Sequence, residues 1–228
     1  MNSVGSAARR SWGGTATLGW SGLALLPWAL ALFAYWRRSE PISDWVKVLA
    51  QLFSLVVVVA AARLAGWQAR EYLALSRPNM RDVALGVGAM IALSLTVSVV
   101  LFATATAGPS VIAQSGTDSP LMGTAYFAAV ALFWVAAVVV DPICEEVFWR
   151  GFAYRGLASS ALGPSGAIIV ISAIFALLHL YGLFGTVFVF LNGILYGWLR
   201  WHTGSLTAPI AAHMFHNGTA AAIATFGN

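Results

Sequence analysis

The sequence predicts an all-α polytopic membrane protein, a bundle of about seven transmembrane helices within a range of roughly six to eight. The chain has 228 residues, of which 60% are hydrophobic and only 9% are charged. Its mean hydropathy of +0.81 is well above that of a soluble domain of this length. The apolar residues also form long runs separated by short polar segments, as expected when each spanning helix takes about 20 residues.

Each run is assigned to one span in chain order. The predicted spans are residues 17–36, 46–66, 83–105, 121–162, 166–181, 184–200 and 205–226. The first run is long and is not followed by a small-residue cleavage site, so a retained span is favoured over a signal peptide. The fourth run includes Pro142, which membrane helices tolerate.

The spans are expected to form one integrated membrane domain. Residues 1–120 are N-terminal helices without a specific motif, whereas residues 121–228 carry the motifs described below. The positive-inside rule places the N-terminus inside, because only three of the 12 basic residues would then lie outside. The inner residues are Arg9, Arg10, Arg63, Arg70, Arg77, Arg81, Arg150, Arg155 and Arg200, and the outer ones are Arg37, Arg38 and Lys47.

Several function classes are disfavoured by composition. The net charge is only +4, and no basic cluster is interleaved with aromatic residues, so the expected partner is the lipid bilayer and not nucleic acid. The single cysteine, Cys144, excludes a disulfide framework and a CxxC metal site. The sequence has neither an H-E-x-x-H motif nor a P-loop.

The segment Asp141–Gly151, D-P-I-C-E-E-V-F-W-R-G, places three charges in an apolar region. Ionisable residues inside a membrane are costly and by default indicate a functional site. Glu146 and Arg150 are spaced i, i+4, which predicts a structural ion pair. Glu145 then lies on a different azimuth, desolvated and without an obvious cation, and this is the environment of a general base.

Helix geometry predicts which polar residues meet this segment. Glu145 lies about 18 residues before the turn near Gly163 and His179 about 16 after it, or ~27 and ~24 Å at 1.5 Å per residue. The same estimate places Asn192 level with His213 across the turn at residue 202. His213 and Asn217 share one helix face. One cavity is therefore expected to be lined by Glu145, Glu146, His179, Asn192, His213 and Asn217.

Each of these residues has a structural interpretation when taken alone. A buried histidine is more often a satisfied core residue, and a buried asparagine commonly joins two helices. The functional interpretation rests on their joint occurrence at matching depths. Ser165, in the G-P-S-G turn, is expected to be a helix N-cap. A serine nucleophile there is disfavoured because the turn is far in depth from His213.

Three motifs together resemble the signature set of the CPBP family. They are Glu145-Glu146-x-x-x-Arg150, Phe175-x-x-x-His179 and His213-x-x-x-Asn217. The family, also called Abi, comprises CAAX prenyl endopeptidases and bacteriocin-processing or immunity proteins. The resemblance covers roughly residues 121–226, and Trp149 stands where the family usually has phenylalanine.

The resemblance implies an intramembrane endopeptidase acting on a membrane-associated peptide or protein. Glu145 would activate water with help from His179, and His213 and Asn217 would stabilise the oxyanion. Glu146 and Arg150 would support these groups, with Asn192 beside them. Zinc or another divalent metal is also compatible, with Glu145, Glu146, His179 and His213 as the candidate ligands. The motif spacing leaves the choice between metal and metal-free chemistry open.

Two other functions stay open. A non-catalytic immunity or partner-binding membrane protein has a precedent in the same family. A proton-coupled transporter is disfavoured, because the chain is short and shows no repeated halves. The expected location is the bacterial cytoplasmic (inner) membrane, where a leader peptide or another membrane protein is a more plausible substrate than a prenylated protein.

Overall fold

The computed structural model describes residues 12–38, 42–77, 79–103 and 130–226, and these residues contain helices and no strand. The predicted all-α polytopic fold is confirmed. The longer helices are α1 (Gly14–Arg38), α2 (Asp44–Leu64), α4 (Met80–Ala103), α8 (Gly163–Leu178), α9 (Leu183–Thr203) and α10 (Thr207–Phe226). A short helix, α3 (Ala69–Tyr72), follows α2. The polar segment 106–120 lies outside the described residues.

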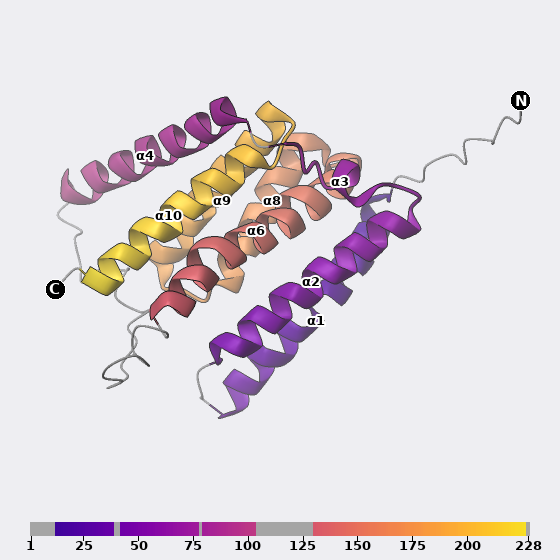
Figure 1. The fold of residues 1–228 in the computed structure, drawn as a ribbon, viewed down its shortest axis with the longest axis horizontal. Helices are drawn as coiled ribbons and strands as arrows, with labels where there is room; N and C mark the ends of the chain where they lie inside the picture. The colour runs from indigo at the N-terminus through magenta and orange to yellow at the C-terminus, as the bar shows by residue number, and fades with distance from the viewer. Residues whose placement is uncertain (1–11, 39–41, 78, 104–129, 227–228) are drawn as a thin grey trace, which may run out of the picture.

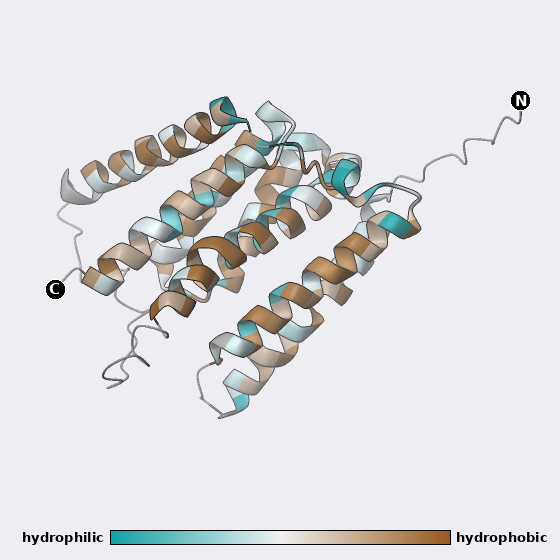
Figure 2. Cartoon of the chain, viewed as in Figure 1, coloured by the Kyte–Doolittle hydropathy of each residue, from teal (hydrophilic) through white to brown (hydrophobic). Residues whose placement is uncertain are grey.

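Four of these helices, α1, α2, α4 and α9, contain a segment that is long and apolar enough to cross a membrane. Helix α8 is shorter and is also apolar. Only 11% of the spanning windows of α1 and α4 is buried inside the protein, so most of their side chains face outwards. Figure 2 shows hydrophobic residues along most of the length of these helices. Such surfaces suit lipid, and the protein is an integral membrane protein.

The central helix is a composite of several segments that run without a break from residue 130 to residue 158. It comprises η2 (Val135–Val140), α6 (Asp141–Glu146), η3 (Val147–Ala153) and α7 (Tyr154–Ala158), where η marks wider π-helical turns. Pro142 has no N–H to donate, and its ring would clash with a carbonyl in an α-helical turn, which accounts for the wide turn before it. Short π-helical segments are frequent at functional sites.

Most of the remaining helices pack around this central helix, and α4 lies beyond α10 (Figure 1). The α1–α2 hairpin lies against α6 and η3 on one side, and α10 packs on η2 and α6. Helix α4 packs against α10, where Gly86 approaches the Ala208 carbonyl. Glycines also allow α8 and α9 to approach closely. A Cβ on Gly193 would lie 2.8 Å from Ser172 Cβ, and one on Gly197 would lie 2.8 Å from Ile168 Cγ2.

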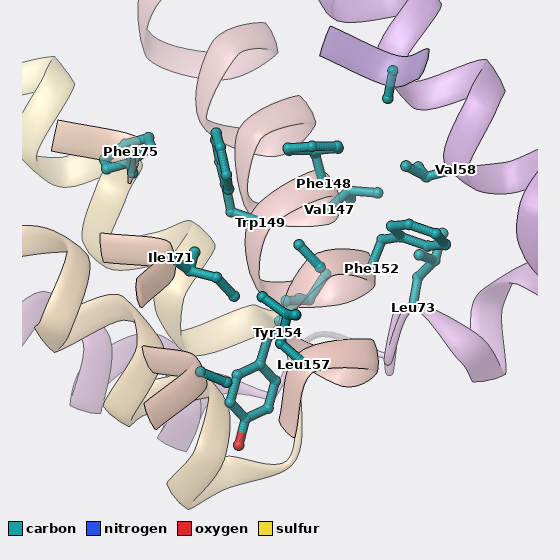
Figure 3. Packing of buried hydrophobic residues seen from close by; sticks show 14 of the residues in the cluster. Val58, Leu73, Val147, Phe148, Trp149, Phe152, Tyr154, Leu157, Ile171 and Phe175 are labelled. Carbon is teal, nitrogen blue, oxygen red and sulfur yellow. The ribbon is translucent and has the colours of Figure 1, made fainter. Parts of the chain in front are cut away.

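Aromatic side chains of the central helix fill the core on both of its sides (Figure 3). Phe148 points toward Val58 of α2, and Trp149 lies on the side of Phe175 of α8. The rings of Trp149 and Phe175 meet edge to face, with centroids 5.9 Å apart. This packing fixes Phe175, which lies among the candidate site residues described below.

The start of α8 differs from the sequence prediction. The helix begins at Gly163, with Leu162 as its N-cap and no side-chain cap bond, so the predicted capping role of Ser165 is wrong. Gly163 has a φ of +63°, a conformation that glycine adopts without strain and that turns the chain into the helix. Ser160 supplies the local polar contact, because its Oγ accepts a hydrogen bond from the Leu162 amide at 3.3 Å.

Candidate active site

The predicted ion pair between Glu146 and Arg150 is present at the centre of the bundle. The exposed fractions of these residues are 0% and 1%. Arg150 Nη1 donates to Glu146 Oε1 at 3.0 Å, and Arg150 Nη2 donates to the Gly193 carbonyl at 3.2 Å. The guanidinium also lies over the rings of Phe175 and Tyr196. Burial of this pair is therefore compensated by hydrogen bonds and cation–π contacts.

Glu146 also holds His213 of α10. His213 Nδ1 lies 2.9 Å from Glu146 Oε1, and the imidazole stacks on Tyr196 with ring centroids 4.9 Å apart. A carboxylate accepts hydrogen bonds, so Nδ1 carries the hydrogen and Nε2 of the neutral ring keeps its lone pair. A histidine held in one tautomer by a carboxylate is a common arrangement in hydrolases.

Glu145 lies on a different side of the helix from this pair, as predicted. Its Oε2 is 3.9 Å from His213 Nε2, and its side chain is 20% exposed. This distance is too long for a direct hydrogen bond. A water molecule about 2.8 Å from each atom would lie to one side of the line that joins them. The other oxygen, Oε1, accepts a hydrogen bond from Gln51 Nε2 at 3.1 Å.

His179 lies at the end of α8, where it is the C-cap residue. Its Nδ1 is 2.7 Å from the Phe175 carbonyl. Since a carbonyl only accepts, Nδ1 donates and Nε2 keeps its lone pair. The Phe175 ring contacts both imidazoles, with centroid distances of 4.6 Å to His179 and 6.1 Å to His213. The FxxxH spacing thus fixes the tautomer of His179, because the ring bonds to a carbonyl four residues earlier in the same segment.

Each of the two asparagines contacts a neighbouring helix. Asn217 Nδ2 donates to the Ala137 carbonyl at 2.8 Å, which joins α10 to η2. Asn192 is 2% exposed and contacts His216, with Nδ2 and Nε2 3.5 Å apart. Asn192 Oδ1 is buried and has no hydrogen-bond partner among the described residues. Asn192 of α9 therefore contacts His216 of α10. His216 lies about one helical turn from His213, the residue that was expected to be level with Asn192.

Sequence reasoning did not include Gln51 or His216 among the candidate site residues. The available signal for Gln51 was a single amide within the apolar run of the second span. For His216 it was its position three residues after His213, about one turn along the helix. Neither signal identifies a partner, because both contacts join segments that are distant in the sequence.

The predicted metal ligands do not form a three-ligand site in this arrangement. Among the described residues, no group of three or more His, Cys, Asp or Glu side chains is placed to hold a metal ion. Glu146 Oε1 is engaged by both Arg150 and His213, and that contact also occupies His213 Nδ1. Glu145 Oε2 and His213 Nε2 are the donor atoms that still face each other. No catalytic step is therefore assigned to a metal here.

The fold and the site define a class, a helical membrane protein with paired glutamates and a histidine, His213, at its centre and a second histidine, His179, at the end of a neighbouring helix. Residues 127–219 match the family model described as type II CAAX prenyl endopeptidase Rce1-like. This segment contains all three motifs, so the resemblance to the CPBP family is confirmed over these residues. The match to this family suggests intramembrane protease activity of the CAAX type. No curated protein and no solved structure matches the chain significantly.

Proposed function

We propose that this protein is an intramembrane endopeptidase with Glu145 as the general base. The supporting observation is the contrast between the two adjacent glutamates. Glu146 is fully buried and bonded to Arg150 and His213, whereas Glu145 is partly exposed and turns Oε2 toward His213 Nε2. A water beside this gap has a carboxylate to take its proton, which is the requirement of general base catalysis.

In the proposed reaction, Glu145 takes a proton from water while the water oxygen attacks the carbonyl carbon of the peptide. His179 Nε2 accepts a hydrogen bond from the other O–H of that water and orients it, and this hydrogen stays on the attacking oxygen. The tetrahedral intermediate carries its negative charge on the former carbonyl oxygen. When the C–N bond breaks, the proton held by Glu145 passes to the leaving amine. General acid–base transfer of this kind contributes about 10²–10⁴-fold to a rate.

The oxyanion is stabilised from α10. Glu146 holds His213 through Nδ1, which leaves Nε2 facing the gap beside Glu145 Oε2. When the ring carries a hydrogen on both nitrogens, Nε2 donates to the oxyanion. The amide of Asn217 has two hydrogens, and the Ala137 carbonyl takes one. The second is available to the oxyanion. Donors of this kind are worth roughly 10²–10³-fold in kcat each.

The substrate in this proposal is a membrane-associated peptide or protein, such as a leader peptide, in the bacterial cytoplasmic membrane. Residues 121–228 form the catalytic core, and the N-terminus is inside. The membrane association of the substrate is inferred from the location of Glu145 on a helix within the apolar bundle. The apolar composition supports the membrane location, and the distribution of basic residues supports the N-terminus inside.

The test is cleavage of a membrane-anchored peptide by the purified full-length protein in liposomes. Glu145→Gln keeps the size of the side chain and removes the base, and we expect at least a 100-fold loss of kcat. Glu71→Gln is the matched control, since it removes the same charge from an exposed residue of α3. Near-normal cleavage by Glu145→Gln would disprove the assigned role. If the wild type cleaves nothing but protects cells or binds a partner, the non-catalytic alternative holds.

A further inference from the structure

A glutamine outside the family-matched segment contacts the proposed base. Gln51 lies on α2, is 5% exposed, and donates from Nε2 to Glu145 Oε1 at 3.1 Å. Helix α2 packs beside α6 along the central helix (Figure 1). The matched segment begins at residue 127, so this hydrogen bond brings the N-terminal helices into contact with the site. A buried amide inside a membrane span requires such a partner.

The hydrogen bond distinguishes the two oxygens of Glu145. Oε1 is held by Gln51, whereas Oε2 faces His213 Nε2 at 3.9 Å. The last torsion of a glutamate side chain is broad and roughly two-fold, so an unheld carboxylate samples many orientations. A donor fixed on another helix restricts that torsion. Gln51 thereby keeps one oxygen directed toward the position where water meets His213.

The position of α2 does not depend on Gln51. One turn further along α2, the Ser54 hydroxyl lies 2.7 Å from the Ala24 carbonyl of α1 and 3.0 Å from the Ala50 carbonyl. Near the other end of the hairpin, Trp12 Nε1 donates to the Ala61 carbonyl at 3.1 Å. These contacts hold α1 and α2 together. Replacing Gln51 is therefore expected to leave the hairpin in place and to change only its contact with Glu145.

We infer that Gln51 is a positioning residue that orients Glu145 for water activation. The inference rests on the proposed function, and it adds that the site is incomplete without α2. Partners that orient a reactive group commonly account for about 10–100-fold in activity, as measured for groups behind metal ligands. The expected defect is in kcat, because Gln51 holds the base and has no assigned contact with the substrate.

The test compares Gln51→Met with Ser54→Ala in the liposome cleavage assay. Methionine keeps the length of the side chain but cannot donate, whereas Ser54→Ala removes a buried polar group one turn away that does not contact Glu145. We expect Gln51→Met to lower kcat about 10–100-fold, with KM changed less than about two-fold and the thermal midpoint unchanged. Ser54→Ala should keep its kcat. Equal loss of kcat in both variants would indicate a packing role and overturn the inference.

Infrared spectroscopy gives a readout that does not depend on cleavage. The difference between wild type and Glu145→Gln identifies the carboxyl band of Glu145. We expect this band to shift in Gln51→Met and not in Ser54→Ala. An unshifted band in an active protein overturns the inference and leaves the proposed function intact. Absence of cleavage by the wild type overturns the proposed function and, with it, the catalytic role of Gln51, even if the band shifts.

Discussion

Two adjacent glutamates have different surroundings because one helix separates their side chains by azimuth. Glu146 faces inward to Arg150 and His213, whereas Glu145 faces α2 and the partly open side. The sequence predicted the ion pair from the i, i+4 spacing, which is a local property of a helix. It could not predict that Asn192 contacts His216. Counting residues from the turn does not fix depth to better than one helical turn, and His213 and His216 are about one turn apart.

Arg150→Met is predicted to destabilise the fold. Arg150 is 1% exposed, and its removal leaves the Glu146 carboxylate buried without a cation. Breaking a buried ion pair in this way typically costs about 3–5 kcal/mol. The measurement is unfolding in detergent, followed by thermal midpoint or by denaturant titration. Arg81→Met is the control, because Arg81 is exposed at the start of α4.

The double variant Glu146→Gln with Arg150→Met separates charge from packing. Neutralising Glu146 removes the unpaired charge, so the double variant should be more stable than Arg150→Met alone. The coupling energy of the cycle gives the interaction between the two residues. An additive result, in which the second substitution lowers stability further, would show that Glu146 and Arg150 do not interact as the structure indicates.

At the scale of elements, the close approach of α8 and α9 positions the site. A Cβ on Gly193 would lie 2.8 Å from Ser172 Cβ, and the Gly193 carbonyl accepts a hydrogen bond from Arg150. Gly193→Ala should therefore push the helices apart and lower both stability and cleavage. Overpacking of this kind costs about 1–3 kcal/mol. Unfolding and kcat measured on the same preparations check the prediction.

Gly88→Ala is the matched control, because a Cβ there meets no atom within 4 Å and the residue lies inside α4. It should leave activity unchanged. Ser172→Gly in the Gly193→Ala background should restore part of the loss, since it removes the atom that clashes. A Gly193→Ala protein that behaves like Gly88→Ala would show that the α8–α9 contact is less tight than described.

The positions of the helices were predicted from long apolar runs, and each described helix longer than 15 residues lies within or across one of those runs. The π-helical turns on either side of α6 were not predicted. Hydropathy has no period that separates a widened turn from an α-helical one, although Pro142 marks where the first of them ends. The start of α8 lies three residues before the predicted start at residue 166, because the chain turns at Gly163 and not at Ser165.

At the scale of the whole molecule, composition and hydropathy were enough to predict the class of fold. The order in which the helices pack was not predictable beyond the antiparallel hairpins. Lipid and neighbouring helices are similarly apolar, so hydrophobicity does not select a partner for α1, α2 or α4. Small residues at close contacts, such as Gly86 against Ala208, determine which helices pack together. Which small residues face each other is known only once both helices have been placed.

Orientation in the membrane is a further whole-molecule prediction, with the N-terminus inside. Cys144 is buried and is the chain's single cysteine, so a Cys144→Ala background allows one new cysteine to be labelled. Ser43 and Gln68 suit this purpose, because both are exposed, flank opposite ends of α2 and make no side-chain cap bond. Three basic residues lie near the Ser43 end, whereas four lie near the Gln68 end and in the segment that leads to α4, namely Arg63, Arg70, Arg77 and Arg81.

With the N-terminus inside, α1 crosses outward and α2 returns, so Ser43→Cys lies outside and Gln68→Cys inside. An impermeant maleimide added to intact cells should label Ser43→Cys, and it should label Gln68→Cys only after the membrane is opened. The physical reason is the retention of basic segments on the inner side during insertion. The reverse labelling pattern would show that the whole bundle has the opposite orientation in the membrane. Because Arg155 donates to the Glu71 and Tyr72 carbonyls beside α3, it would also move that end of the central helix to the outer face.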